Sequence, residues 1–174
     1  YLKDNMFTVI PLSELINNIK NVKPLGDKTV AITFDDGYQD NMTFAKPILD
    51  KFGYPYTIFI NPSIINRNSA SYLSWKQLKS LADEGVIIAN HGYTHDSTAR
   101  KPETETEEQW IKSYTDKLVE AEAIIKEKTG QNWQYFGYPY GEYTPAVQQW
   151  MKDNNYVAFS QQSGAVGLKT DLTS

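Results

Sequence analysis

The stretch Val30-Ala31-Ile32-Thr33-Phe34-Asp35-Asp36-Gly37 joins a β-forming run to two adjacent acidic residues and a glycine. We interpret the run as a short buried strand, because its residues are apolar or β-branched throughout. Asp35 and Asp36 then lie at its C-terminal end, where Gly37 turns the chain. An ordinary turn would account for one of these acids without any function. Two adjacent carboxylates repel each other near an apolar strand end, however, and a bound cation would relieve that repulsion.

Strand-like and helix-like segments alternate along the rest of the chain. This alternation predicts a parallel sheet with helical crossovers, in either an open α/β sheet or a barrel. Only about five strands are expected, so a closed barrel of eight would be incomplete. The runs that predict strands are residues 30–34, 56–60, 86–89, 134–138 and 156–160.

Two of the predicted helices carry the signals of a capped N-terminus. Ser74 with Gln77, and Thr104 with Glu107, match the capping-box spacing ahead of apolar residues at helical intervals. The second of these helices is long, has an acidic first turn and is expected to stop at Gly130.

The chain contains only two histidines, His91 and His95, and both follow the third predicted strand. Their spacing is a weak signal by itself, because such pairs are often ordinary core or solvated residues. Chemistry in parallel α/β folds gathers at the carboxyl ends of strands, so the pair is expected to converge with Asp35 and Asp36. Two imidazoles and one carboxylate form a three-ligand set typical of Zn²⁺ sites with an open coordination position. The second aspartate would remain free to move protons.

Composition argues against several classes of partner. The 17 basic and 21 acidic residues give a net charge of −4, and no basic stripe suits a phosphate backbone, so nucleic acid is not expected as a partner. The apolar runs are far shorter than the roughly 20 residues that span a bilayer, so no transmembrane segment is expected. The absence of cysteine excludes a disulfide framework. We interpret Tyr1 as a cut terminus that a signal peptide or anchor could have preceded.

Three motifs resemble those of the polysaccharide deacetylases, the NodB-type domain of carbohydrate esterase family 4. The first two are Thr33-Phe34-Asp35-Asp36-Gly37-Tyr38 and Asn90-His91-Gly92-Tyr93-Thr94-His95. The third, Phe136-Gly137-Tyr138-Pro139-Tyr140-Gly141, departs from the family pattern because Gly137 stands where an arginine is usual. The resemblance spans about Val30 to Ser160. It implies a distorted, incomplete (β/α) barrel, which we expect to form a single domain over residues 1–174 that lacks its last strands.

The resemblance also implies a role for individual residues. Asp36, His91 and His95 would bind a divalent metal, with Zn²⁺ favoured and Co²⁺ or Ni²⁺ as alternatives. Asp35 would be the general base that acts on a metal-activated water. Tyr140 would donate its backbone N–H to the oxyanion. Independently of the resemblance, aromatic residues near the strand ends are expected to contact the substrate, with Tyr38 and Tyr140 the best placed and a packing role as the alternative for either.

Two features of the family pattern are missing. The arginine that steadies the catalytic aspartate is replaced by Gly137, and no histidine remains to serve as the general acid. Either the chain ends before the last motifs, which we favour, or this branch has dispensed with that acid. General acid–base assistance contributes roughly 10² to 10⁴ in rate, so activity need not be lost.

We therefore expect a hydrolase that removes acetyl groups from a polysaccharide or oligosaccharide, with N-acetyl favoured over O-acetyl. A different amide hydrolase on the same scaffold is one alternative. The other is a catalytically silent, metal-containing carbohydrate-binding domain. The expected class of substrate implies an extracytoplasmic location, secreted, periplasmic or at the cell surface, whereas the oligomeric state and the identity of the glycan stay open.

Overall fold

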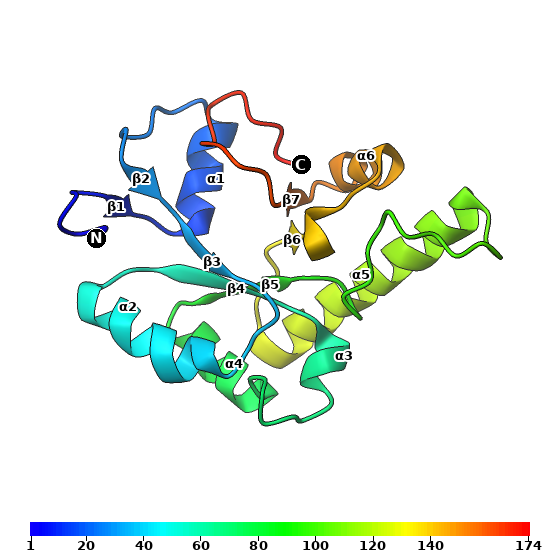
Figure 1. Ribbon diagram of the computed structural model, residues 1–174, viewed down its shortest axis with the longest axis horizontal. Helices are drawn as coiled ribbons and strands as arrows, with labels where there is room; N and C mark the ends of the chain where they lie inside the picture. Colours follow the sequence, from blue (N-terminus) through cyan, green and yellow to red (C-terminus); the bar gives the residue numbers. More distant parts are fainter.

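The computed structural model describes residues 1–174. Its main sheet has five parallel strands in chain order, and each strand pairs with the next (Figure 1). This is the strand order of a (β/α) barrel left open, which confirms the predicted fold class. A bridge between Ala158 and Thr173 continues the parallel order past the last of these strands. The five strands are β3 (Ile32–Phe34), β4 (Tyr56–Ile60), β5 (Ile87–Asn90), β6 (Tyr135–Gly137) and β7 (Val157–Phe159).

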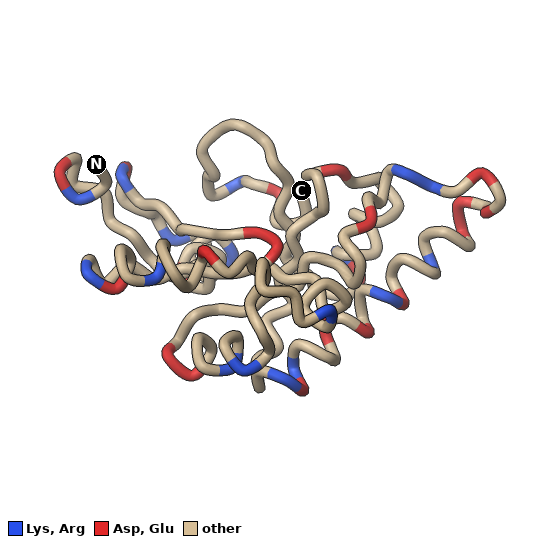
Figure 2. The backbone as a smooth tube through the Cα atoms, turned by 60° about the horizontal axis from the view of Figure 1, so that its bottom comes forward, with Lys and Arg blue, Asp and Glu red and all other residues tan.

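Six α-helices and a small additional sheet complete the fold. A π-helical turn, Asn41–Ala45, leads into α2, and a 3₁₀ turn, Pro139–Gly141, follows β6. None of the helices combines the length and hydropathy that crossing a bilayer requires. Figure 2 shows lysine and arginine interspersed with aspartate and glutamate along the chain. The additional parallel strands are β1 (Thr8–Val9) and β2 (Thr29–Val30), and the helices are α1 (Leu12–Lys20), α2 (Lys46–Phe52), α3 (Pro62–Ile65), α4 (Trp75–Asp83), α5 (Glu107–Thr129) and α6 (Pro145–Asp153).

Both faces of the sheet are buried, because side chains alternate along each strand. On one face, Ile58 and Ile88 pack with residues of α2, α4 and α5. On the other, Phe59 and Ile87 pack against Leu12 of α1, which Figure 1 shows on the opposite side of the strands from α2 and α4. The core therefore holds the strands rigidly, and the loops at their carboxyl ends start from fixed positions.

The structure confirms one predicted capping box and corrects the other. Ser74 and Gln77 cap α4 reciprocally, as predicted. The predicted Thr104/Glu107 box is wrong, because α5 is capped two residues later by Thr106 and Gln109. Both spacings fit the repetitive segment before α5, and burial of the helix face that begins at Trp110 decides the register. The helix ends in a left-handed cap at Gly130, as predicted.

The run that was expected to be a buried strand, 30–34, is neither continuous nor fully buried. Its two halves belong to different sheets, since Val30 pairs with β1 and Ile32 begins the pairing with β4. Thr33 is exposed, because β3 is an edge strand of the main sheet. The strand nevertheless delivers Asp35 and Asp36 to its carboxyl end as predicted.

The buried carboxyl group of Glu122 on α5 yields a prediction about pH. Burial raises the pKa of Glu122 above its ordinary value of 4.5, although the hydrogen bond from Asn90 acts to lower it. Between 4.5 and the raised value, the folded chain holds a proton that the unfolded chain has lost, so the free energy of unfolding falls as pH rises. We expect Glu122→Gln to remove this contribution and to be more stable than wild type at pH 7.

Urea unfolding between pH 4 and pH 8 measures this contribution as the difference between wild type and variant. Glu120→Gln is the matched control, because Glu120 is exposed on the same helix. A Glu122→Gln variant whose stability tracks that of wild type at every pH would contradict the prediction.

Candidate metal centre

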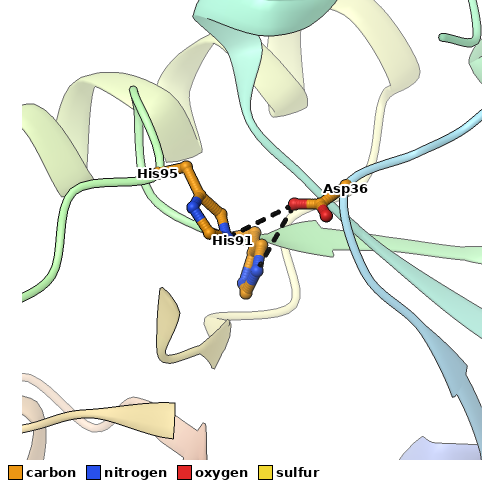
Figure 3. A group of neighbouring side chains, drawn as sticks. All are labelled: Asp36, His91 and His95. Atoms are coloured by element: carbon orange, nitrogen blue, oxygen red, sulfur yellow. Dashed lines mark ion pairs between the residues drawn. The ribbon is translucent and has the colours of Figure 1, made fainter. Parts of the chain in front are cut away.

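Asp36 reaches the centre through an unusual backbone turn. Asp36 and Gly37 both adopt left-handed conformations with φ of 68° directly after β3. A side chain at position 37 would lie 2.9 Å from Ile60, so only glycine fits beside β4. Aspartate tolerates the left-handed region better than most residues, although it still carries a steric cost. The turn directs the carboxylate of Asp36 at the two histidines (Figure 3).

His91 is held in one tautomer by its surroundings. The ring is 2% exposed, and its Nδ1 lies 2.8 Å from the carbonyl oxygen of Gly137. Because a carbonyl can only accept, Nδ1 carries the proton, and Nε2 keeps its lone pair toward Asp36. Burial lowers the pKa of His91, with the charge of Asp35 acting in the opposite direction. The neutral ring is the form that binds metals.

His95 completes a compact group of three side chains. Its Nε2 lies 3.4 Å from Oδ1 of Asp36, and the Nε2 of His91 lies 3.7 Å from the same oxygen. One candidate ligand atom from each residue lies within 4.8 Å of the others. This donor set, two imidazole nitrogens and one carboxylate oxygen, suits Zn²⁺ and related divalent ions. The predicted convergence of Asp36, His91 and His95 is therefore present in the structure.

Asp35 lies beside this group without belonging to it. It lines a cavity of about 210 Å³ together with His91, Gly137 and Phe159. None of the ion pairs in the structure includes Asp35. No cationic side chain therefore pairs with the Asp35 carboxylate at the wall of this cavity.

The two tyrosines predicted to contact substrate lie near the centre. Tyr140 is half exposed, and its backbone is in the left-handed region with φ of 60°. The centroid of its ring lies 4.6 Å from that of His95. Tyr38 stacks on Tyr72 with ring centroids 5.0 Å apart. The hydroxyl of Tyr72, together with the negative charge of Asp36, raises the pKa of Tyr38 to about 12. Tyr38 therefore stays protonated and able to donate a hydrogen bond.

The structure adds Arg100 to the surroundings of the centre. Its guanidinium lies 4.6 Å from the ring centroid of Tyr140, and Nε lies 3.3 Å from Glu142. Arg100 and Tyr140 line a second cavity of about 380 Å³ together with His95, one of the three candidate ligands. No spacing in the sequence signals this contact, since 40 residues separate the two stacked side chains.

A comparison with protein families agrees with this fold. Residues 22–159 match the family model described as polysaccharide deacetylase. The chain belongs to the polysaccharide deacetylase family. The matched range contains Asp35, Asp36, both histidines and Tyr140.

Individual polysaccharide deacetylases agree with this assignment. The putative polysaccharide deacetylase YxkH of Bacillus subtilis is 36% identical over 96 residues, which are 55% of this chain and 33% of that protein. The peptidoglycan-N-acetylglucosamine deacetylase of Bacillus cereus is 27% identical over 134 residues, covering 77% of this chain and 44% of that protein. The chain thus spans less than half the length of these two relatives.

Solved structures share the fold over nearly the whole chain. The deacetylase domain of BpsB from Bordetella bronchiseptica superposes with a TM-score of 0.86 at 19% identity, covering 99% of this chain and 78% of that one. IcaB from Ammonifex degensii gives a TM-score of 0.82 at 26% identity, covering 94% of this chain and 72% of that one.

Gly137 departs from the usual pattern of the polysaccharide deacetylases for a steric reason. A Cβ atom at this position would lie 3.0 Å from Nδ1 of His91 and 3.3 Å from the ring of Phe59. Neither Arg67 nor Arg100 supplies the missing cation, because Arg100 pairs with Glu142 and no ion pair involves Arg67 or Asp35. Because of the contacts that a Cβ atom would make with His91 and Phe59, an arginine at position 137 would displace His91 in this chain.

We expect Gly137→Ala to disturb the centre directly. The added methyl group must push the His91 ring away from the carbonyl that orients it. Overpacking of this kind costs about 1–3 kcal/mol, and loss of the orienting bond is expected to weaken metal binding roughly 10-fold or more. Urea unfolding and metal titration measure the two effects. Gly167→Ala is the control, because its Cβ would meet nothing within 4 Å, and equal metal affinities for both variants would refute the steric account.

Proposed function

We propose that this chain is a metal-dependent deacetylase that removes acetyl groups from N-acetylated amino sugars of a polysaccharide or peptidoglycan. The observation that carries the proposal is the free carboxylate of Asp35, which lies beside the three-ligand set and lines a cavity with His91. A binding module has no need for an unligated acid at this point. Relatives named as deacetylases of peptidoglycan N-acetylglucosamine and of poly-β-1,6-N-acetyl-D-glucosamine favour an N-acetyl substrate over an O-acetyl one.

The residues of this chain divide the work of amide hydrolysis. A divalent ion held by Asp36, His91 and His95, with Zn²⁺ favoured over Co²⁺ and Ni²⁺, would polarise the acetyl carbonyl and acidify a bound water. Asp35 accepts a proton from the water as its oxygen adds to the acetyl carbon. The carbon–nitrogen bond then breaks to leave acetate, and the proton taken by Asp35 becomes available to the departing amine.

The surroundings of Tyr140 suit both oxyanion and sugar binding. Its backbone is in the left-handed region and its ring packs against that of His95, and we assign its N–H to the developing oxyanion. The exposed part of its ring, next to the cavity lined by Arg100, offers a stacking surface for a sugar. Tyr38, which is also exposed, is assigned a similar contact.

The location and the metal follow from the same proposal. A polymeric glycan substrate of this class implies an extracytoplasmic site of action, such as the cell surface or periplasm. Zn²⁺ is favoured because imidazole and carboxylate ligands in a three-residue set are typical of catalytic zinc.

Acetate release from N-acetylated chito-oligosaccharides tests the function. We expect release by the metal-loaded chain, its loss after chelation and its recovery on adding Zn²⁺. Acetylated xylan, assayed in parallel, separates ester from amide specificity. Tight metal binding without acetate release from any acetylated glycan would instead support the alternative of a catalytically silent carbohydrate-binding domain. The lack of a cationic side chain paired with Asp35 also favours that alternative.

A further inference from the structure

Gly92 follows His91 and begins the loop that leads to His95. The peptide groups on both sides of Gly92 are held by hydrogen bonds. The N–H of Gly92 donates to Oδ1 of Asn90 at 2.9 Å. The carbonyl of Gly92 accepts from Nδ2 of Asn61 at 3.1 Å. The same Asn61 nitrogen also donates to the carbonyl of His91. Backbone atoms on both sides of the glycine are therefore fixed by two asparagine side chains.

These asparagines lie at the carboxyl ends of neighbouring strands. Asn90 is the last residue of β5 and pairs in register with Ile60, and Asn61 follows Ile60 at the end of β4. Both asparagines are 0% exposed. Asn90 is anchored from behind, because its Nδ2 donates to the carbonyl of Leu118 and to Glu122 on α5. The rigid sheet and helix thus hold the loop through buried amides.

Asn61 has a feature that packing alone does not account for. Its Oδ1 is buried without a hydrogen-bond partner, although its Nδ2 is used twice. An unsatisfied buried acceptor is destabilising, by about 1–3 kcal/mol in typical cases. An apolar residue at this position would avoid that cost but would leave the two loop carbonyls unheld. Asn61 therefore satisfies two carbonyls of the loop between the histidines at the cost of one unpaired acceptor of its own.

We infer that Asn61 is a positioning residue for the metal centre, an inference that rests on the metal binding proposed above. Gly92 has no side chain and adopts a φ of 82°, so without the clamp its backbone would sample many conformations. His95 would then move relative to His91. Asn61 and Asn90 hold this backbone in place, so that both Nε2 atoms face Asp36 before an ion arrives.

Metal affinity tests this role without reference to activity. Zn²⁺ binding to wild type, Asn61→Ala and Asn61→Leu is measured by competition with a chromophoric chelator, and Co²⁺ absorption reports the ligand geometry. We expect both variants to bind roughly 10- to 100-fold more weakly, the range for groups that orient metal ligands. Asn61→Leu keeps most of the side-chain volume and so separates the lost donors from a cavity.

Thr57→Ala is the matched control. Thr57 lies in β4, the strand that Asn61 directly follows, is 0% exposed and has a buried hydroxyl without a partner. It is expected to keep the Zn²⁺ affinity and the Co²⁺ spectrum of wild type. The inference would be overturned if both Asn61 variants bound Zn²⁺ as tightly as wild type, or if Thr57→Ala lost as much Zn²⁺ affinity as they do. A wild-type chain that binds no Zn²⁺ would overturn it as well. A wild type that binds Zn²⁺ but releases no acetate would refute only the proposed function.

Discussion

Replacing Asp35 by asparagine is expected to lower kcat for acetate release by about 10² to 10⁴, the usual contribution of a positioned acid–base group. Asparagine matches aspartate in shape but cannot take a proton from water. Asp35 lies outside the three-ligand set and in no ion pair of the structure. The substitution therefore removes the base while leaving the ligands in place, and Zn²⁺ affinity is expected to stay at the wild-type value.

Asp40→Asn provides the matched control for this experiment. Asp40 contacts Asn41 rather than the histidines, so the same change from carboxylate to amide should leave kcat unaltered. Steady-state acetate release and metal titration, performed on the same preparations, separate rate from binding. If Asp35→Asn turned over as fast as wild type, Asp35 could not be the general base.

Asp36→Asn is expected to weaken metal binding, whereas Asp35→Asn lowers kcat. We expect a loss of metal affinity of roughly 100-fold or more, which is at or beyond the upper end of the range for groups that only orient ligands. The carboxylate of Asp36 is the one anionic donor in the set, 3.4 Å and 3.7 Å from the two imidazole nitrogens. A neutral amide is a poorer ligand for a divalent ion. Asparagine tolerates left-handed backbone, so the turn at φ of 68° survives and the effect reports on charge.

The two variants can be told apart by adding metal. Excess Zn²⁺ should restore part of the activity of Asp36→Asn, because its defect is occupancy, but none of the activity of Asp35→Asn. Affinity is followed by chelator competition and activity by acetate release. Undiminished affinity in Asp36→Asn would remove Asp36 from the ligand set and would assign the carboxylate ligand elsewhere.

The strands could be predicted from local sequence because their signal is local. Short apolar and β-branched runs bounded by turn residues marked all five strands of the main sheet. The convergence of Asp36 with His91 and His95 was also predictable, since parallel strands share one carboxyl edge. The start of α5 was not, because Thr104 and Thr106 offer equivalent caps and burial of Trp110 decides between them.

Exposure was harder to predict than secondary structure. Phe44, Ile48 and Phe52 recur at helical spacing, yet all three are exposed, and Leu49 supplies the buried contact of α2. A periodic apolar pattern states which residues share a helix face, but not whether another element covers that face. Asn61 and Arg100 were missed for a related reason, since their partners lie 30 and 40 residues away.

The sequence by itself determined the order of strands and helices, the family motifs and the residue types able to bind a metal. These depend on local propensity and on the limited number of residues suited to such chemistry. Only the tertiary structure decided how those residues work together. It directed the Nε2 atom of His91 toward Asp36 through the carbonyl of Gly137, left Asp35 outside the group of three candidate ligands and held Gly92 between side chains from the ends of two strands. Each of these depends on distances between segments far apart in the chain, which packing sets and local sequence does not encode.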